Sequence, residues 1–407
     1  MNGLFAGGLL LAVLVALLQL FGGNPDVASA TIQAMFAAAD LAVEVCIGLI
    51  GVLTLWSGLF RLAEKSQLAD RLAQAVAPVM GRLMPTVKDH PEALAPVTMN
   101  LSANMLGLDN AATPLGLKAM EALQRHNPTP DTATDSQIMF LVMNTSSVTL
   151  LPVTVMMYRA QQGAVNPADV YLPLLMATTA STFVGVWLTA RLQRISLNQP
   201  LIWLVALGWL LLLGLGAVAA LSLPGAEAAR FSGIAGSVIL LLVVMSFILA
   251  GWRAKLNIYD TFIDGASEGF MMAVKLIPYL VAMLVMIAML RACGALDLLL
   301  EGIRWLVALT GADDRFVDAL PVALLKPLSG SGARAMMIEV MQTQGVDSLA
   351  GRMAAVMQGS TETTLYVLAV YFGSSGIVRI RYALWCGLAA DFSGLLTAIL
   401  VSYLFFA

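Results

Sequence analysis

Long apolar stretches alternate with short polar connections along almost the whole chain. A stretch of about 20 apolar residues is long enough to cross a bilayer as a helix. The stretch at 31–60 is longer and predicts a strongly tilted span. The expected spans are 3–21, 31–60, 137–160, 169–191, 199–222, 231–251, 268–291, 352–372 and 381–405. This pattern predicts an all-α integral membrane protein with about nine spans.

Two further apolar pieces, at about 92–107 and 316–328, are too short to cross a bilayer. Each ends in a polar turn that contains glycine and then continues into an amphipathic segment. Non-helical backbone is tolerated at membrane depth only where protein or water covers it. We therefore expect two re-entrant helical hairpins, at Pro96–Ala122 and Pro321–Met341.

The same order of elements occurs twice. A span with a glutamate is followed by an amphipathic segment, a hairpin, a span with a polar interruption and a final span. Glu44 opens the first series and Glu268 opens the second, and the hairpin prolines follow them by 52 and 53 residues. The Glu268 span comes five crossings after the Glu44 span. Five is odd, so the two repeats should have inverted orientations.

Basic residues fall mostly on one side of this arrangement, where Arg61, Lys65, Arg253 and Arg379 lie. The positive-inside rule then places the N terminus in the cytoplasm. Residues 3–21 lack the basic n-region of a signal peptide, so we expect them to be a retained first span.

Composition supports the membrane class. The 407 residues are 59% hydrophobic and 12% charged, whereas soluble proteins carry roughly 25% charged residues. A net charge of −3 gives no indication of nucleic-acid binding, so the lipid bilayer is the expected large partner. The three cysteines are scattered in apolar stretches, and His90 and His126 form no ligand pair with a cysteine. We therefore expect no metal site.

Two polar runs interrupt otherwise apolar spans: MNTSSVTLL at 143–151 and MQGSTETTL at 357–365. Polar groups in lipid are costly unless they are paired or line a wet cavity. Such matching interruptions are typical of a solute or ion site between two repeats. The alternative is that the hydroxyls bond back to their own helix. The candidates are Asn144, Ser146, Gln358, Ser360, Thr361, Glu362 and Thr363, of which only Glu362 is a carboxylate.

In the first hairpin, Asn100 and Asn104 share one helical face. Asp109 or Asn110 is placed to cap the helix that follows. The start of a helix inside the protein can hold a carboxylate, a phosphate or a polar ring. In the alternative interpretation, these side chains only satisfy the backbone of the turn.

In the second hairpin, Ser329 or Ser331 can cap the next helix, and Arg334 falls near the start of that helix. A cation there opposes the helix dipole and needs a partner. The partner is either an anionic substrate or one of two carboxylates, Glu268 and Glu362. Glu44, Glu268 and Asp391 also lie within apolar spans, where ion coupling and interhelical hydrogen bonding are both open.

These residues carry a resemblance to a known family. Residues 1 to about 195 resemble spore maturation protein A, and the remainder resembles spore maturation protein B. The segments that carry the resemblance to spore maturation protein A are VEVCIGLIG (43–51) and ANMLGLDNAATPLGLKAM (103–120). The segments that carry the resemblance to spore maturation protein B are DGASEGF (264–270), IPYLVAML (277–284), KPLSGSGARA (326–335) and GSTETTLYVLAVYFG (359–373). The chain looks like a fusion with domains at 1–195 and 196–407, the second with an extra leading span at about 199–222.

The resemblance places both parts in the nucleoside recognition, or Gate-domain, group, which is similar to concentrative nucleoside transporters and to the membrane part of ferrous iron transporters. It implies two inverted Gate repeats in a bacterial inner membrane, without implying a particular solute. The iron transporters use cysteine-bearing gate motifs and a fused GTPase. This chain has serine and glycine in its second hairpin and no nucleotide-binding GxxxxGKS or GxxxxGKT loop. Iron transport and nucleotide hydrolysis are therefore not expected.

We predict a secondary transporter for a small polar or anionic organic solute, with nucleoside-like compounds as the first class. Ser360, Thr361 and Thr363 would help Glu362 bind the coupling proton or sodium ion, with Glu44 and Glu268 as further coupling residues. The expected solute-binding residues are Asn100, Asn104, Asp109, Asn110, Asn144, Ser146, Ser329, Ser331, Arg334 and Gln358.

The alternative is a membrane scaffold or sensor that keeps the Gate fold without transporting. An enzyme is not expected, because the chain has no HExxH motif and no histidine near a candidate nucleophile. No cofactor beyond a coupling ion is expected. A homo-oligomer is also compatible with the sequence.

Overall fold

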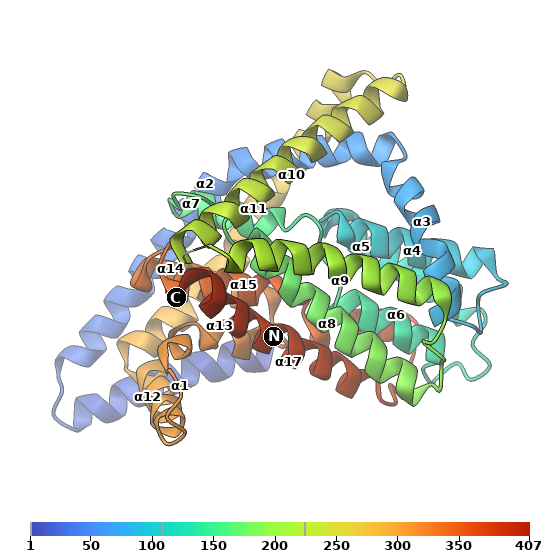
Figure 1. The fold of residues 1–407 in the computed structure, drawn as a ribbon. Coiled ribbons are helices and arrows are strands. Elements are labelled where there is room, and N and C mark those ends of the chain that lie inside the picture. The colour runs from blue at the N-terminus through green and yellow to red at the C-terminus, as the bar shows by residue number, and fades with distance from the viewer. Residues whose placement is uncertain (1, 108, 224) are drawn as a thin grey trace.

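The computed structural model describes residues 2–107, 109–223 and 225–407. These residues form α-helices, one short 3-10 helix and their connections (Figure 1). Within the described residues, the nearest approach to a sheet is an isolated bridge between Thr132 and Arg379. The expected all-α class is confirmed.

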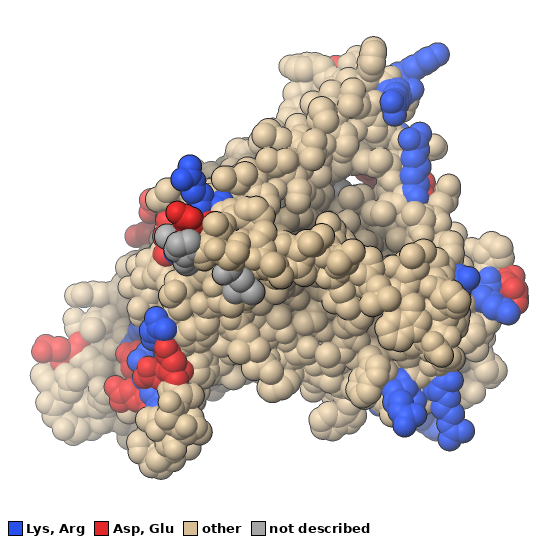
Figure 2. All heavy atoms as spheres, viewed as in Figure 1, with Lys and Arg blue, Asp and Glu red and all other residues tan. Residues whose placement is uncertain are grey.

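In the described part of the chain, six helices are long and apolar enough to cross a membrane. Lys, Arg, Asp and Glu lie mainly at the margins of the face in Figure 2, and the centre of that face is nearly free of them. A shorter apolar helix, α1 (Asn2–Phe21), precedes the six. The six candidate spans are α2 (Asp26–Lys65), α8 (Tyr171–Leu192), α9 (Pro200–Leu221), α10 (Gly225–Arg253), α11 (Ile258–Ala292) and α17 (Ala383–Phe406).

Each of the two spans with a polar run is broken into two helices, as expected. In the first, α6 ends at Thr145, and Pro152 directly precedes α7. Proline lacks the N–H that would continue a helical ladder. In the second, the break lies between Gly359 and Thr364. The four pieces are α6 (Asp135–Thr145), α7 (Val153–Gln161), α15 (Leu349–Gly359) and α16 (Thr364–Ser374).

Both re-entrant hairpins are present, each preceded by an amphipathic helix. The arms of the second hairpin are unequal, because its first helix has six residues and its second has fifteen. The first helix of the first hairpin has fifteen residues. A 3-10 helix, η1 (Arg315–Asp318), takes up part of the difference. The elements are α3 (Leu68–Leu83), α4 (Pro91–Met105) and α5 (Asp109–Gln124), and then α12 (Ala295–Ala308), α13 (Leu320–Leu325) and α14 (Gly330–Gln344).

The first helices of the two series, α2 and α11, run antiparallel in close contact (Figure 1). A Cβ on Gly58 would lie 2.6 Å from the ring of Phe262, and one on Gly269 would lie 2.5 Å from the carbonyl of Leu53. As residue numbers fall along α2 they rise along α11, so the helices point in opposite directions. Glycine makes this approach of two backbones feasible.

The last helices of the two series, α8 and α17, form a second antiparallel pair. A Cβ on Gly185 would lie 3.1 Å from that of Ala390, and the Ser393 hydroxyl donates to the Ala180 carbonyl at 3.3 Å. Corresponding helices of the two halves thus pair in opposite directions. Inverted repeats produce this relationship.

The connections before α6 and α17 also meet across the two halves. The Ala133 N–H donates to the Arg379 carbonyl at 3.0 Å, and Arg381 donates to Asp135 at 2.7 Å. The largest group of buried apolar residues likewise draws on both halves, from α2, α7 and α8 to α11, α14, α15 and α17. The two repeats therefore share one core.

Candidate functional site

The two helix breaks touch each other. The Glu362 N–H, in the second break, donates to the Thr145 carbonyl at the end of α6 at 2.7 Å. Each break also bonds to the hairpin of its own repeat. The Leu150 N–H donates to the Met105 carbonyl at 2.9 Å, and the Leu365 N–H donates to the Pro327 carbonyl at 3.1 Å. Three backbone N–H groups at the breaks are thus paired within the protein, as membrane depth requires.

Asn100 and Asn144 lie against each other in the interior. Asn144 Nδ2 donates to Asn100 Oδ1 at 2.5 Å, and Asn100 Nδ2 donates to the Ala112 carbonyl at 2.6 Å. The Tyr371 side chain is close to both amides. A Cβ on Gly116 would lie 2.1 Å from the Tyr371 hydroxyl, so the ring needs glycine there. Asn100 therefore fits the alternative in which the side chains of the first hairpin satisfy its backbone, because its amide hydrogen-bonds to the Ala112 carbonyl beyond the turn.

The rest of the first turn is less fully described. The Asn104 Nδ2 atom is buried and has no hydrogen-bond partner within the described part of the chain. The side chains of Asp109 and Asn110 lie outside the described residues, so their predicted capping role stays a prediction.

The second hairpin has the expected serine cap. Ser329 Oγ accepts from the Gly332 N–H at 2.9 Å and lies 3.3 Å from Ser331 Oγ. A Cβ on Gly330 would lie 2.8 Å from Thr363 Oγ1. Glycine therefore allows the hairpin tip to pack directly on the break between α15 and α16.

Arg334 is half-buried and has neither an ion pair nor a side-chain hydrogen bond among the described residues. One expected partner, Glu268, is paired with Arg61 on α2 instead. Glu268 is thus part of an exposed pair between α2 and α11, and Glu44 is exposed on α2. Neither glutamate joins the helix breaks, whereas Arg334 remains available to an anion.

Several hydroxyls of the breaks bond back to their own helices. Ser146 donates to the Val142 carbonyl at 2.8 Å, and Ser360 donates to the Met357 carbonyl at 2.8 Å. These two residues thus fit the alternative in which hydroxyls in a span bond back to their own helix. Gln358 differs, because its Oε1 atom is buried without a hydrogen-bond partner among the described residues.

A carboxylate on α17 faces the second break. Asp391 is 1% exposed, and within the described part of the chain neither of its carboxylate oxygens has a hydrogen-bond partner. The hydroxyls of Thr364 and Thr361 are close enough to act on it, yet neither makes a hydrogen bond with any described residue. Ser181, on α8, adds another buried hydroxyl of the same kind. Among the described residues, five oxygens without hydrogen-bond partners thus lie on α17, on the second break and on the part of α8 that packs against Gly394.

Two glycines hold α17 against this break. Gly387 and Gly394 lie four residues before and three residues after Asp391, on the same helical face. A Cβ on Gly387 would lie 2.7 Å from Thr364 Cγ2, and one on Gly394 would lie 2.8 Å from Thr361 Cγ2. The spacing of glycine, aspartate and glycine therefore positions the carboxylate at the break.

Two charged groups act on Asp391 from other elements. Lys326 lies at the end of α13, is 4% exposed and attracts the carboxylate, whereas Glu362 repels it. The sequence marks Asp391 only as one of several carboxylates in spans. It does not indicate that Lys326, Thr364 and Ser181 lie near this carboxylate or near the break that it faces. The glycine spacing around Asp391 was the signal that could have singled it out.

Glu362 itself is exposed, unlike the hydroxyl residues beside it. Tyr366, one helical turn further along α16, is 54% exposed. The same helix contacts the second hairpin near Thr363 and the first hairpin at Tyr371. Eight residues of helix span roughly 12 Å. The points at which the two hairpins contact this segment are thus separated by about the length of a small organic solute.

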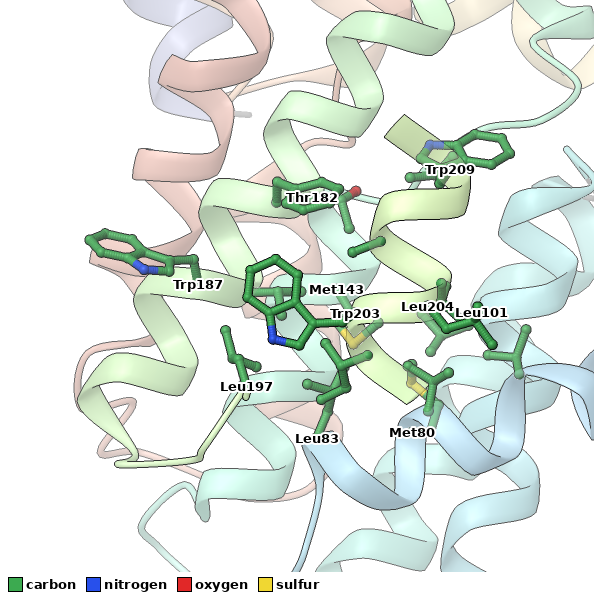
Figure 3. Close-up of a pocket in the computed structure, with 18 of the residues that line it drawn as sticks. Met80, Leu83, Leu101, Met143, Thr182, Trp187, Leu197, Trp203, Leu204 and Trp209 are labelled. Carbon is green, nitrogen blue, oxygen red and sulfur yellow. The ribbon is translucent and has the colours of Figure 1, made fainter. Parts of the chain in front are cut away.

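A separate cavity of about 970 Å³ lies between α3, α4, α6, α8 and α9 (Figure 3). Its lining is almost entirely apolar and includes Trp187, Trp203 and Trp209. Ser147 and Thr182 bring it close to the first break. Such a lining suits a hydrocarbon chain rather than a polar solute, which needs placed polar groups.

Comparisons with known proteins agree with this architecture. The family model for nucleoside recognition, Gate, matches residues 46–161 and 273–378, one segment in each repeat. The chain is similar to spore maturation protein B of Bacillus subtilis (strain 168), with 40% identity over 165 residues, which are 40% of this chain and 91% of that protein. It is also similar to spore maturation protein A of the same organism, with 41% identity over 150 residues, which are 37% of this chain and 76% of that protein. The chain is therefore a multi-pass membrane protein of the nucleoside recognition (Gate) family, with segments similar to spore maturation proteins A and B fused in one polypeptide.

Proposed function

We propose that this protein is a secondary transporter for a small polar or anionic organic solute, with nucleoside-like compounds as the first candidate class. The solute would cross the bacterial inner membrane, and the N terminus of the protein would lie in the cytoplasm. The contact between the two helix breaks, at Glu362 and Thr145, carries the proposal. Interrupted helices that meet between inverted repeats are the arrangement on which alternating access depends.

The solute would bind between the hairpins, along the exposed side of α16. Arg334 supports an anionic group on the solute, because this half-buried cation has no ion pair within the described residues. Glu362 and Tyr366 offer an acceptor and an aromatic ring to a polar or ring-shaped part. Asn104, whose buried Nδ2 atom has no hydrogen-bond partner among the described residues, would contribute from the first hairpin.

Coupling to a proton or sodium ion is assigned to Asp391 in this proposal, rather than to the exposed Glu362. A buried carboxylate is costly in its charged form unless a cation is at hand. A proton on Asp391 would remove the charge. A sodium ion would be held by the carboxylate together with the hydroxyls of Thr361, Thr364 and Ser181, which are oxygen ligands without other partners among the described residues.

A thermal-shift screen of the purified protein tests the proposal. Nucleosides, organic acids and metal ions are added with and without sodium and at two pH values. A ligand that binds the folded state raises the unfolding temperature with its concentration above the dissociation constant. We expect one solute class to stabilise the protein, more strongly in the presence of the coupling ion. The stabilising solute is then measured for gradient-driven uptake in proteoliposomes.

Two results would overturn the proposal. One is the absence of stabilisation by every solute class, together with the absence of flux. This result would favour a membrane scaffold that retains the fold. The other is stabilisation without uptake under either a proton or a sodium gradient, which would favour a sensor.

A further inference from the structure

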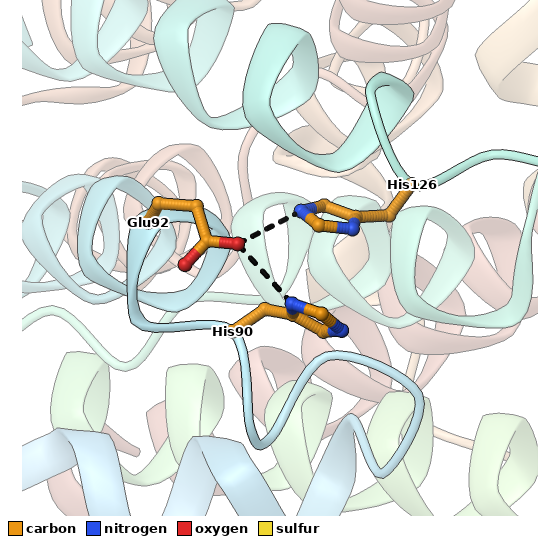
Figure 4. A group of neighbouring side chains, drawn as sticks. All are labelled: His90, Glu92 and His126. Atoms are coloured by element: carbon orange, nitrogen blue, oxygen red, sulfur yellow. Dashed lines mark hydrogen bonds and ion pairs between the residues drawn. The ribbon is translucent and has the colours of Figure 1, made fainter.

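The chain contains two histidines, and the fold brings both to one glutamate (Figure 4). His90 directly precedes α4, and Glu92 lies in the first turn of that helix. His126 follows the end of α5, at the other end of the same hairpin. Glu92 Oε1 is 3.1 Å from His90 Nδ1 and 3.2 Å from His126 Nε2. Three potential metal ligands therefore meet at the base of the first hairpin.

The distances among these atoms suit a shared metal ion. All three ligand atoms lie within 4.8 Å of one another. A tetrahedral ion about 2.0–2.1 Å from each ligand separates the ligands by roughly 3.3 Å. The separations from Glu92 to the two rings are already close to that value. The ring centroids are 4.2 Å apart, so the imidazoles lie side by side rather than splayed. Small side-chain rotations would complete the coordination.

The chemistry of the ligands selects the class of metal. Imidazole nitrogen favours zinc and its first-row neighbours, whereas calcium and magnesium prefer oxygen ligands alone. The side chains of His90, Glu92 and His126 are 46%, 60% and 27% exposed, so an ion can reach them from the aqueous phase. With three protein ligands, water would occupy the fourth position.

Simple hydrogen bonding is the competing account of the cluster. In that account, each imidazole donates an N–H to Glu92, and the contact only ties the two hairpin ends together. A backbone hydrogen bond at Glu92 itself, and then a hydrogen bond from His90, lower the pKa of the Glu92 carboxyl, so the carboxylate form is available in either account. The two accounts differ in what happens when a divalent ion is added.

We propose that His90, Glu92 and His126 bind a divalent first-row transition ion, with zinc as the first choice, and that this ion fastens the two ends of the first hairpin. The first arm of this hairpin, α4, carries Asn100 and Asn104, so the site can regulate how freely the hairpin tip moves. The proposal stands on the cluster alone and does not depend on transport.

Zn²⁺ titration of the full-length protein without a histidine tag tests the site, with Co²⁺ absorption as a spectroscopic report of imidazole coordination. We expect one ion per chain and a higher unfolding temperature when zinc is present. His90→Ala, His126→Ala and Glu92→Gln should each weaken binding by about 10-fold or more, because even supporting residues of metal sites contribute on that scale. Asp89→Asn, which neutralises an exposed carboxylate next to the cluster, should bind as the wild type does.

The unfolding temperature without metal shows whether each variant is folded. The three ligand variants are expected to keep it near the wild-type value, because the side chains are partly exposed. The proposal is overturned if the wild type binds no zinc, or if zinc binding survives in all three ligand variants. An equal loss in Asp89→Asn and Glu92→Gln would also overturn it, since it would indicate nonspecific attraction to surface charge. A ligand variant that proves unfolded is replaced by His126→Gln, read by the same Co²⁺ absorption.

Discussion

Arg159 and Asp347 lie 188 positions apart in the chain, and Arg159 Nη2 donates to Asp347 Oδ1 at 2.9 Å. Arg159 lies near the end of α7 in the first repeat and is fully buried, while Asp347 precedes α15 in the second. Asp169 is 2.9 Å from Arg159, and Arg352 of the second repeat is 2.7 Å from Asp169. Two cations and two carboxylates thus join the repeats at the end opposite the connections before α6 and α17.

Asp169→Asn should destabilise the protein strongly. The change leaves the buried guanidinium of Arg159 with one carboxylate instead of two, and removing one partner of a buried pair costs about 3–5 kcal/mol. Unfolding in detergent measures the effect. The matched control is Asp131→Asn, because Asp131 faces Arg379 at 3.6 Å with both side chains exposed. Exposed pairs contribute about 0–1 kcal/mol. Equal losses in the two variants would contradict a role for the buried network.

Gly394→Ala should push α17 away from the second break. The added methyl would lie 2.8 Å from Thr361 Cγ2 and 3.1 Å from Ser181 Cβ. Overpacking of this kind costs about 1–3 kcal/mol, and it should also weaken ion-dependent stabilisation by displacing Asp391. Gly373→Ala is the control, because a Cβ there meets nothing within 4 Å. That variant should be neutral or stabilised by roughly 0.5–1 kcal/mol, since alanine is the better helix former. If Gly394→Ala behaved like Gly373→Ala, close packing at the break would be ruled out.

Asp391→Asn should abolish the dependence of solute binding and uptake on the coupling ion, while the protein remains folded. Asparagine has the same shape without the charge, so the relief of a desolvation cost is offset by the loss of the attraction to Lys326. The unfolding temperature should therefore stay near the wild-type value. The measurement is the ion dependence of both the thermal shift and uptake in proteoliposomes.

Glu362→Gln provides the comparison, because Glu362 is the carboxylate that the sequence favours for coupling. If Asp391 binds the ion, Glu362→Gln should alter solute affinity but keep the ion dependence. The reverse pattern, with coupling lost in Glu362→Gln and intact in Asp391→Asn, would return the coupling role to Glu362.

Arg334→Gln should reduce stabilisation by anionic solutes more than stabilisation by neutral ones. Arg334 has no ion pair among the described residues, so its removal should change the stability of the solute-free protein by only about 0.5 kcal/mol. Thermal shifts with paired anionic and neutral solutes measure the difference. Arg315→Gln is a suitable control, because Arg315 is an exposed cation paired with Asp313. A similar change for both solute types would show that Arg334 does not contact an anionic group.

Much of the fold could be predicted from local patterns. The break after Thr145 and the break after Gly359 both fall where polar runs enter apolar spans. The amphipathic helix α3 (Leu68–Leu83) follows the first glutamate span, where the repeated order of elements predicts it. These features depend on a short window of sequence, because apolar length and the energetic cost of polar groups in lipid act on each segment separately.

The residues of the site were harder to predict. Glu362 is in the second break as expected, but its side chain is exposed, and Asp391 from another helix is the buried carboxylate there. Asn100 was expected to face solute, yet its amide is engaged by Asn144 and the Ala112 carbonyl. A sequence pattern places a residue on a helix, whereas its partner depends on how distant helices pack.

The sequence by itself determined the membrane class, the two repeats, their hairpins and the position of each interruption, since these follow from hydrophobic length and the order of elements. Only the tertiary structure decided that Asp391 meets Thr361 and Thr364, that Arg159 bridges the repeats, and that His90 and His126 share Glu92. Each of these contacts joins segments that are separate in the chain. They arise because the antiparallel packing of α2 with α11 and of α8 with α17 brings the two halves into one core.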